Sequence, residues 1–297
     1  MTQAILSGTA IGALYVLMSI GFALNLEIAD IVNVAHGAFV VGGMYLTLEL
    51  GRAGVPTIAA VLLTAIGIGL ISYPIYALLI RSARATGGHR NQLVFSLLLF
   101  SALTVVYQIC FSADVQTLGH RFMSVHLFGG VLTTAQLSAI GLAVVVAVGL
   151  YLVARFTIVG KLAYVASRYP LGARSVGVPV DRIYGAVFVL ASFLAGLGGG
   201  VLMTVNPVEP TLGLNLIIVV FLVALVARTH LLGCLVLGLV YGIVQSTLAY
   251  SIDATSAATL TTALFLVAMV GQQLIERGAG LYRRLLRPRP TLSGAGQ

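Results

Sequence analysis

The chain has 297 residues, of which 59% are hydrophobic and only 8% are charged, and its mean hydropathy is +1.07. A soluble domain carries roughly 25% charged residues, so this composition excludes a soluble globular fold and indicates an integral membrane protein. The formal net charge is +8, and the positive charges gather in a few segments.

Long runs without a charged residue divide the chain, and each can hold one helix of the roughly 20 residues that cross the hydrocarbon core. Residues 31 to 48 are a further candidate. The runs are continuously apolar, whereas barrel strands alternate over about 10 residues, so helices are favoured. We predict an all-α polytopic transmembrane helix bundle of eight or nine spans, in which the second helix is broken or re-entrant. The charge-free runs are 1–26, 53–80, 91–113, 122–154, 183–208, 210–227, 229–252 and 254–275.

Basic residues gather between the predicted spans at 81–90, at 155–182 and from residue 276 onward. Cytoplasmic loops hold the excess of Lys and Arg, so we expect these segments and the C-terminus to lie in the cytoplasm. If residues 31 to 50 form a full span, the N-terminus lies outside and there are nine spans. If they are re-entrant, it lies inside and there are eight. We expect residues 1–287 to form a single transmembrane domain and residues 288–297 a flexible cytoplasmic tail.

The stretch IVNVAHGAFVVGG, residues 31 to 43, places polar side chains in an apolar run. Asn33, His36 and Gly37 fall within about one helical turn, so the two polar side chains can share a face. A polar group inside a span is costly unless it is paired or faces water. Two interpretations stay open at this point. The polar pair holds neighbouring helices together, or it lines a transport pathway beside a helix that is broken near the midplane.

The segment 155–182 is the longest stretch of low hydropathy. It predicts a short helix, a break at Pro170 and a second short helix that ends near Gly177, because proline marks a turn or a helix start. One interpretation is a basic loop at the membrane surface, and the other is a docking helix for a cytoplasmic partner.

Enzyme signatures are absent from the sequence. It has no GxxxxGK[ST] phosphate loop, no HExxH and no nucleophile elbow, so we expect a transport subunit without an ATPase site of its own. Cys110 and Cys234 lie in apolar runs and form no metal signature. No Asp or Glu lies in the middle of a predicted span, which argues against a proton-coupled carrier. GALYVLMS (12–19) also resembles GAVFVLAS (185–192), as an inverted repeat would give.

Two blocks resemble one family. The N-terminal block carries the phrase Ile31, Val32, Asn33, Val34, Ala35, His36, Gly37 and Phe39 after a glycine-rich helix. A second block, GKLAYVASRYPLGARSVGVPVDRIYGAVFVLASFLAGLGGGVL, carries Ala173, Arg174, Gly177, Val180, Asp181 and Arg182, and Asn206 and Pro207 follow it. Together they resemble bacterial ABC permeases for branched-chain amino acids, of the LivH type.

The resemblance implies a multi-pass permease subunit of the bacterial inner membrane, embedded in membrane lipid and without a role for nucleic acid. Such a subunit pairs with a second homologous permease chain. A periplasmic binding protein delivers the substrate, and two cytoplasmic subunits bind the ATP, so no cofactor is expected on this chain. The segment expected to dock on the ATPases consists of Arg168, Tyr169, Pro170, Leu171, Gly172, Ala173, Arg174 and Gly177.

The sequence departs from the family pattern at two places. Family members carry an acidic residue followed by alanine where this chain has residues 169–172, and a glycine-rich run where it has Val226, Ala227, Arg228, Thr229 and His230. Relatives with the same N-terminal phrase carry urea or short amides, so these substrates are an alternative to branched-chain amino acids. An ion-coupled secondary carrier is the alternative from a different class.

Overall fold

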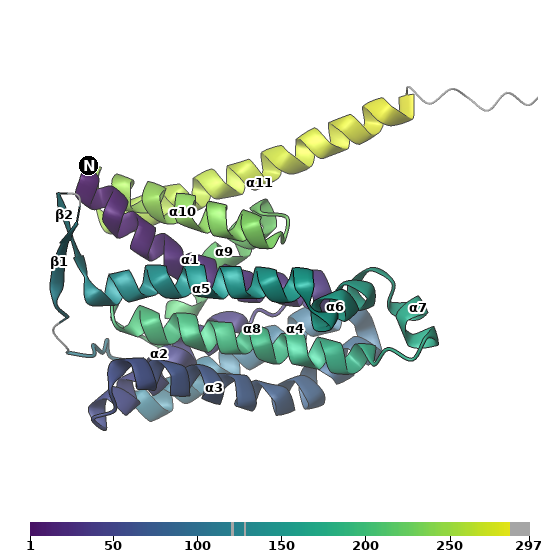
Figure 1. The fold of residues 1–297 in the computed structure, drawn as a ribbon, viewed down its shortest axis with the longest axis horizontal. Coiled ribbons are helices and arrows are strands. Elements are labelled where there is room, and N and C mark those ends of the chain that lie inside the picture. The colour runs from purple at the N-terminus through teal and green to yellow at the C-terminus, as the bar shows by residue number, and fades with distance from the viewer. Residues whose placement is uncertain (120–121, 128, 286–297) are drawn as a thin grey trace, which may run out of the picture.

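The computed structural model describes residues 1–119, 122–127 and 129–285, so the expected tail at 288–297 lies outside the described residues (Figure 1). Within this part, seven helices are long and apolar enough to cross a membrane, which confirms the all-α membrane bundle. The elements are α1 (Thr2–Ala29), α2 (His36–Arg52), α3 (Thr57–Ile75), the π-helical η1 (Tyr76–Ile80), α4 (Arg81–Phe111), β1 (Ser124–Leu127), β2 (Gly130–Thr133), α5 (Thr134–Phe156), α6 (Ile158–Arg168), α7 (Pro170–Ser175), α8 (Val180–Met203), α9 (Leu212–Val226), α10 (Leu231–Ser251) and α11 (Ala254–Leu285).

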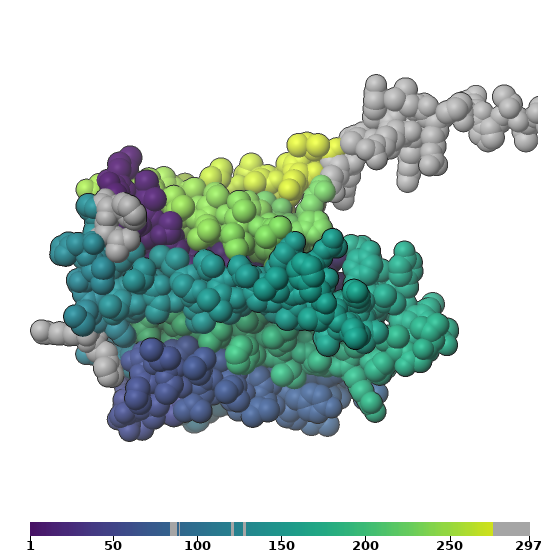
Figure 2. Space-filling model, viewed as in Figure 1, coloured from purple at the N-terminus to yellow at the C-terminus, as the bar shows by residue number. Residues whose placement is uncertain are grey.

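The bundle has two ends with different structures (Figure 1). At one end, here called the hairpin end, β1 and β2 pair antiparallel with Ser124 opposite Thr133. The Gln3 side chain extends this hairpin: its Nε2 donates to the Val131 carbonyl at 2.9 Å and its Oε1 accepts from the Val131 N–H at 2.7 Å. At the opposite end, here called the α7 end, α6 lies beside the start of α8 and α7 projects beyond it (Figure 1). Figure 2 shows the same face with its atoms filled in.

The chain crosses between these ends nine times within the described residues. The seven long helices and the shorter apolar helix α9 account for eight of the crossings. The other is residues 30 to 52, because Glu27 pairs with Arg168 at the α7 end while Arg52 Nη2 donates to Gln116 Oε1, 2.9 Å away, at the hairpin end. Of the two expected counts, the path of the chain agrees with nine, and Met1 and the hairpin share one end.

Helices α1 and α8 form the centre of the bundle, with 67% and 78% of their most apolar stretches buried, against 11% for Arg90–Phe111. Glycines let these backbones approach their neighbours closely. A Cβ atom on Gly43 of α2 would lie 2.7 Å from the Gly196 carbonyl oxygen of α8. The sequence therefore places its densest glycine run, residues 196 and 198–200, where helices touch most closely.

The two central helices run in opposite directions. Gly21 of α1 lies beside Ala191 and Leu194 of α8, whereas Met18 lies beside Gly198, so the residue numbers rise along one helix as they fall along the other. The similar segments 12–19 and 185–192 thus lie in antiparallel helices, as an inverted repeat requires. Helix α1 is followed by the shorter helix α2, and helix α8 is followed by the shorter helix α9.

The segment 81–90 differs from the loop that the charges suggested. The backbone is helical on both sides of Gly88, whose φ of 61° and ψ of −144° are non-helical. Glycine tolerates this left-handed region without steric penalty. The sequence has two adjacent glycines here, Gly87 and Gly88, and the helical backbone is interrupted at the second of them.

Candidate functional site

The second crossing is broken. Helix α1 ends at Asp30, whose φ of 55° and ψ of 42° are left-handed, and the Ile31 N–H donates back to the Asn25 carbonyl at 3.1 Å. Aspartate tolerates this conformation better than most residues. Residues 31–35 are not helical, and α2 begins at His36. The break expected from Asn33, His36 and the glycines is present.

His36 places the start of α2 near the middle of the bundle. Its Nε2 atom lies 3.1 Å from the carbonyl oxygen of Met18, and Met18 stands roughly 18 Å before the end of α1 at the helical rise per residue. The hydrocarbon core is about 30 Å thick. Residues 30–35 therefore return about 18 Å alongside the end of α1 without helical hydrogen bonds, and α2 continues toward the hairpin end.

Ser96 of α4 supplies part of the hydrogen bonding that the broken segment lacks. Its Oγ accepts from the Val34 N–H at 3.2 Å and lies 3.4 Å from the Val32 carbonyl. Non-helical backbone at membrane depth persists only where protein covers it, and both Asn33 and Ser96 are fully buried. Ser96 was not expected from the sequence, where it is one of several serines in a largely apolar helix.

The His36 ring lies between α1 and α2 and is fully buried. It packs edge-on against Phe22 with 5.9 Å between ring centroids. Because the Met18 carbonyl can only accept, the Nε2 atom of His36 carries the proton. The Nδ1 atom has no hydrogen-bond partner, so this ring still has one acceptor to offer.

Further polar atoms near the break are buried without partners. Both amide atoms of Asn33 and of Asn25 lack a hydrogen bond, and so does Ser19 Oγ. The great majority of buried polar atoms in proteins are hydrogen-bonded, so these groups need water or a ligand to satisfy them. The structure thus brings Asn33 and His36 into one region of unsatisfied polar atoms, but both side chains are closed off from solvent.

Gly37 lies at a contact between two short helices. A Cβ atom on Gly37 would overlap the Gly213 carbonyl, and one on Gly213 would lie 3.0 Å from the Gly37 carbonyl oxygen. The first turns of α2 and α9 therefore meet backbone to backbone, and the positive ends of both helix dipoles converge there. Gly213 was not predicted, although a Val-Asn dipeptide precedes each of the two short helices, at 32–33 and at 205–206.

The predicted docking segment has the expected form. Tyr169, with a φ of −136°, separates α6 from α7, Pro170 is the first residue of α7, and Gly177 follows with a φ of 82°. Ala173 is buried, and Arg174 Nη2 lies 3.1 Å from Asp181 Oδ1, so these two residues fix α7 to the bundle.

The outer face of this segment is not covered by any other residue that the structure describes. Tyr169 is 67% exposed and Leu171 is 77% exposed, Gly172 is exposed and Pro170 is half-buried. An apolar face at the end of a membrane bundle, beyond the long helices, has no hydrocarbon to cover it. The arrangement suits a protein contact.

Glu27 connects the docking segment to the turn between α9 and α10. Its Oε1 lies 3.2 Å from Arg168 Nη2, its backbone carbonyl accepts from Ser167 Oγ at 2.7 Å, and its Oε2 accepts from Thr229 Oγ1 at 2.5 Å. The Thr229 hydroxyl also lies 2.6 Å from the Arg228 carbonyl, but a carboxylate is the stronger acceptor. This connection was not predicted from the sequence.

Arg228 and Thr229 have left-handed φ values of 53° and 60°. This is the place where the sequence departs from the glycine-rich run of the family it resembles. Left-handed backbone favours glycine, so the turn keeps a glycine-like shape with side chains that do not prefer it.

Three comparisons with known proteins agree with this architecture. The family of branched-chain amino acid transport system permease components matches residues 4–271. The probable branched-chain amino acid transport permease protein LivH of Methanocaldococcus jannaschii is 26% identical over 249 residues, which cover 80% of this chain and 78% of that protein. In the solved structure of PsaBC from Streptococcus pneumoniae in complex with Fab, one chain shares the fold with a TM-score of 0.52, at 13% identity and 90% coverage of each chain. With its broken second crossing and its nine passages, the chain belongs to the family of branched-chain amino acid transport system permease components.

Proposed function

We propose that this permease is the membrane subunit of an ATP-driven importer for branched-chain or related amino acids. It forms half of the translocation pathway, and a second homologous permease chain forms the other half. Two cytoplasmic subunits bind and hydrolyse the ATP, and an external binding protein delivers the substrate. Family membership supports the transport role, and the name of the methanogen relative supports the substrate class.

The observation that carries the coupling proposal is the exposed face of α7. The helix is short, it is fixed to the bundle by Ala173 and Arg174, and it presents Leu171 outward with 77% of that residue exposed. A partner that closes on this face pushes directly on α8, because Asp181 lies in the first turn of α8. ATPase movement would thereby reach a central helix of the bundle.

The orientation follows from the charges. The α7 end carries the basic segments 81–90 and 155–182, so we assign it to the cytoplasm. We propose that the protein lies in a bacterial inner membrane, that the basic C-terminal segment is also cytoplasmic, and that Met1 and the β1–β2 hairpin lie outside. The transmembrane domain is proposed to cover residues 1–287, with the coupling segment at 155–182 as part of it.

For the pathway we propose Asn33 and His36, with Gly37 as the close contact that positions them. Their support is the set of unpartnered polar atoms at the break: both amide atoms of Asn33 and Nδ1 of His36. A neutral zwitterion that enters this region when the subunit opens would supply both a donor and an acceptor. Few fixed charges compete with it there, because residues 31–48 contain no Asp, Glu, Lys or Arg.

The experiment is co-purification with the ATPases combined with uptake of leucine in the presence of the binding protein. Leu171→Asp places a charge on the outer face of α7 and is expected to abolish both ATPase association and uptake. The matched control is Met123→Asp at the hairpin end, which changes a residue of equal exposure, 77%, and is expected to keep ATPase association. If Leu171→Asp keeps both activities at the level of the unmodified chain, the docking proposal is wrong.

A further inference from the structure

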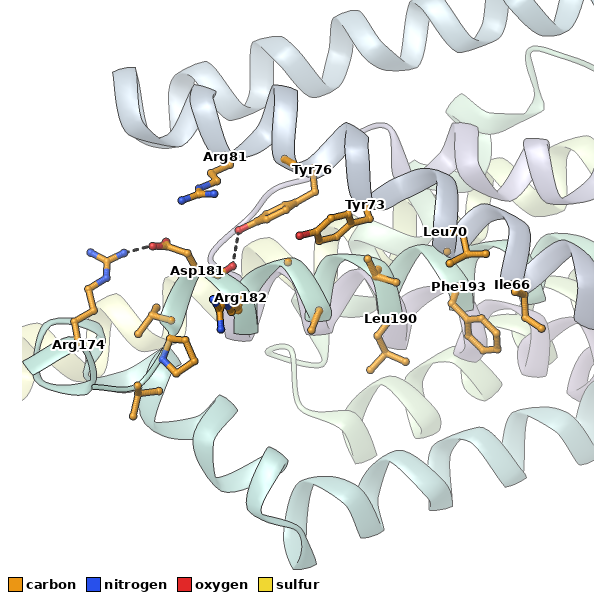
Figure 3. Close-up of a pocket in the computed structure, with 18 residues that line it drawn as sticks. Ile66, Leu70, Tyr73, Tyr76, Arg81, Arg174, Asp181, Arg182, Leu190 and Phe193 are labelled. Atoms are coloured by element: carbon orange, nitrogen blue, oxygen red, sulfur yellow. Dashed lines mark hydrogen bonds and ion pairs between the residues drawn. The ribbon is translucent and has the colours of Figure 1, made fainter. Parts of the chain in front are cut away.

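A groove of about 1300 Å³ lies between α3 and α8 at the α7 end of the bundle (Figure 3). Apolar side chains from both helices line its inner part, including Ile66 and Leu70 on one wall and Leu190 and Phe193 on the other. Leu70 is 69% exposed and Ile66 50%, so the groove opens sideways toward the hydrocarbon. It is larger than the roughly 300–1,000 Å³ that small-molecule pockets occupy.

The mouth of the groove is positively charged. Arg81, Arg174, Asp181 and Arg182 surround it, and Arg174 pairs with Asp181. Arg81 and Arg182 have no ion-pair partner in the part of the chain that the structure describes. Figure 3 shows Arg81 reaching toward the mouth from the α3–α4 side while Arg182 belongs to the α8 side. Among the described residues, the mouth therefore carries three guanidinium groups against the one carboxylate of Asp181.

Tyrosines separate the charged mouth from the apolar part. Tyr76 of η1 donates its hydroxyl proton to the Asp181 carbonyl at 3.2 Å. Tyr73, which is 59% exposed, precedes it by about one turn in α3 and lies on its inner side, toward the apolar part of the groove (Figure 3). Tyrosine is enriched where lipid headgroups meet the hydrocarbon. The groove thus passes from guanidinium through phenol to aliphatic side chains, in the same order as the layers of a leaflet.

The length of the groove matches one leaflet. From Arg182 at the mouth to Phe193 at the inner end, α8 rises by about 16 Å, and the hydrocarbon core of a bilayer is about 30 Å thick. An acyl chain that starts at the mouth therefore ends where the apolar lining ends.

We propose that the groove binds one anionic phospholipid. Its phosphate lies between Arg81 and Arg182, and its acyl chains lie along Leu70, Leu190 and Phe193. Guanidinium groups recognise phosphate through paired hydrogen bonds, and basic pockets between transmembrane helices are known lipid headgroup sites. A free phosphate ion would satisfy the arginines but leave the apolar walls uncovered, and a zwitterionic lipid would bring its own cation to the two arginines. The bound lipid would lie beside Asp181 and so beside the attachment of α7.

A tryptophan reporter tests this proposal. The chain contains no tryptophan, so Tyr73→Trp gives a fluorescence signal from the groove alone. The full-length variant is placed in vesicles of phosphatidylcholine that contain increasing fractions of dibrominated phosphatidylglycerol or dibrominated phosphatidylcholine, and quenching reports which lipid occupies the groove. Each arginine contributes roughly a fivefold preference for an anionic lipid. The expected preference for the brominated phosphatidylglycerol is therefore roughly twenty-five-fold, and Arg81→Gln with Arg182→Gln should remove it.

Two controls separate this site from the general attraction of a basic protein for anionic lipid. Arg155→Gln removes an exposed arginine near the end of α5 and should keep the preference. A reporter at Tyr250→Trp, which replaces a 70% exposed residue at the hairpin end, should show none. Equal quenching by both lipids overturns the proposal, as does a preference that survives the double arginine change. Quenching by neither lipid would show that protein fills the groove, and loss of the preference on adding inorganic phosphate would show a free-anion site. Either result also overturns the proposal.

Discussion

Thr229 donates a hydrogen bond of 2.5 Å to Glu27, and the other carboxylate oxygen of Glu27 lies 3.2 Å from Arg168. One side chain at the end of α1 therefore joins the α9–α10 turn to the segment proposed to meet the ATPases. Thr229 is β-branched and has a φ of 60°, a conformation that costs about 1–2 kcal/mol. The hydrogen bond to Glu27 helps to hold this turn in its strained shape.

Replacing Thr229 separates the strain from the hydrogen bond. Thr229→Ala and Thr229→Gly both remove the hydroxyl, but only glycine relieves the left-handed backbone. We expect Thr229→Gly to be more stable than Thr229→Ala by about 1 kcal/mol, measured as thermal unfolding in detergent. The matched pair is Thr204→Ala and Thr204→Gly, at a φ of −77°, where glycine should be the less stable of the two. Equal stability of the two variants at position 229 would argue against strain in the turn.

His36 can be tested by replacing one ring nitrogen at a time. In His36→Gln, the side-chain amide can still donate to the Met18 carbonyl, but nothing takes the place of Nδ1. If Nδ1 serves transport, the amount of protein in the membrane should stay unchanged and uptake should fall about tenfold, the effect of losing one hydrogen bond of about 1.4 kcal/mol. Uptake and membrane level are measured on the same cells.

The control for His36 is a buried hydrogen bond away from the break. Thr47 Oγ1 donates to Thr64 Oγ1 at 3.0 Å between α2 and α3, and Thr47→Val should lower stability and uptake per cell together. If His36→Gln lowers protein level and uptake in proportion, the histidine only packs α1 against α2, and the pathway role is wrong.

The contact between α2 and α9 predicts a ranking of glycine substitutions. Gly37→Ala forces a Cβ atom onto the Gly213 carbonyl, whereas Gly213→Ala leaves 3.0 Å to the Gly37 carbonyl oxygen. Overpacking costs about 1–3 kcal/mol, so Gly37→Ala should be the more destabilising. Gly67→Ala and Gly149→Ala meet no atom within 4 Å and should be neutral or slightly stabilising, because alanine favours helices. Thermal unfolding of the four variants gives the ranking, and an equal effect of all four would show that no such contact exists.

Cysteine labelling tests the orientation. In a Cys110→Ala background, the remaining Cys234 is buried and should not react. A cysteine introduced by Met123→Cys at the hairpin end should react with an impermeant maleimide on intact spheroplasts. One introduced by Ser175→Cys in α7 should react only in inside-out vesicles. The reverse pattern would place α7 outside and would exclude ATPase docking there.

Much of this fold could be predicted because hydropathy and charge act over the whole length of a span. The break in the second crossing was also predictable, since an asparagine and a histidine beside glycines are costly in a plain helix. Pro170 and Gly177 likewise bound the short α7 by local backbone chemistry. These signals all lie within a few residues of the structure they determine.

The rest depends on contacts between residues far apart in the sequence. Ser96 stands 62 residues from Val34, and Glu27 stands 202 residues from Thr229. Neither pair has a local signal, because a serine in an apolar helix and a glutamate at a helix end are both common. The sequence could not decide between eight and nine spans for the same reason. The choice rested on whether residues 30–35 reach the other side, and this depends on the helices packed around them.

The meeting of Gly37 and Gly213 has a mechanical consequence. Large side chains that interlock at an interface change between discrete arrangements, because each move requires new rotamers. Neither glycine has a side chain to interlock, so a tilt of α2 against α9 at this point is limited by the bordering side chains of Ile217 and Phe100. The two short helices follow the antiparallel helices α1 and α8, so such a tilt would move one short helix from each half of the chain together.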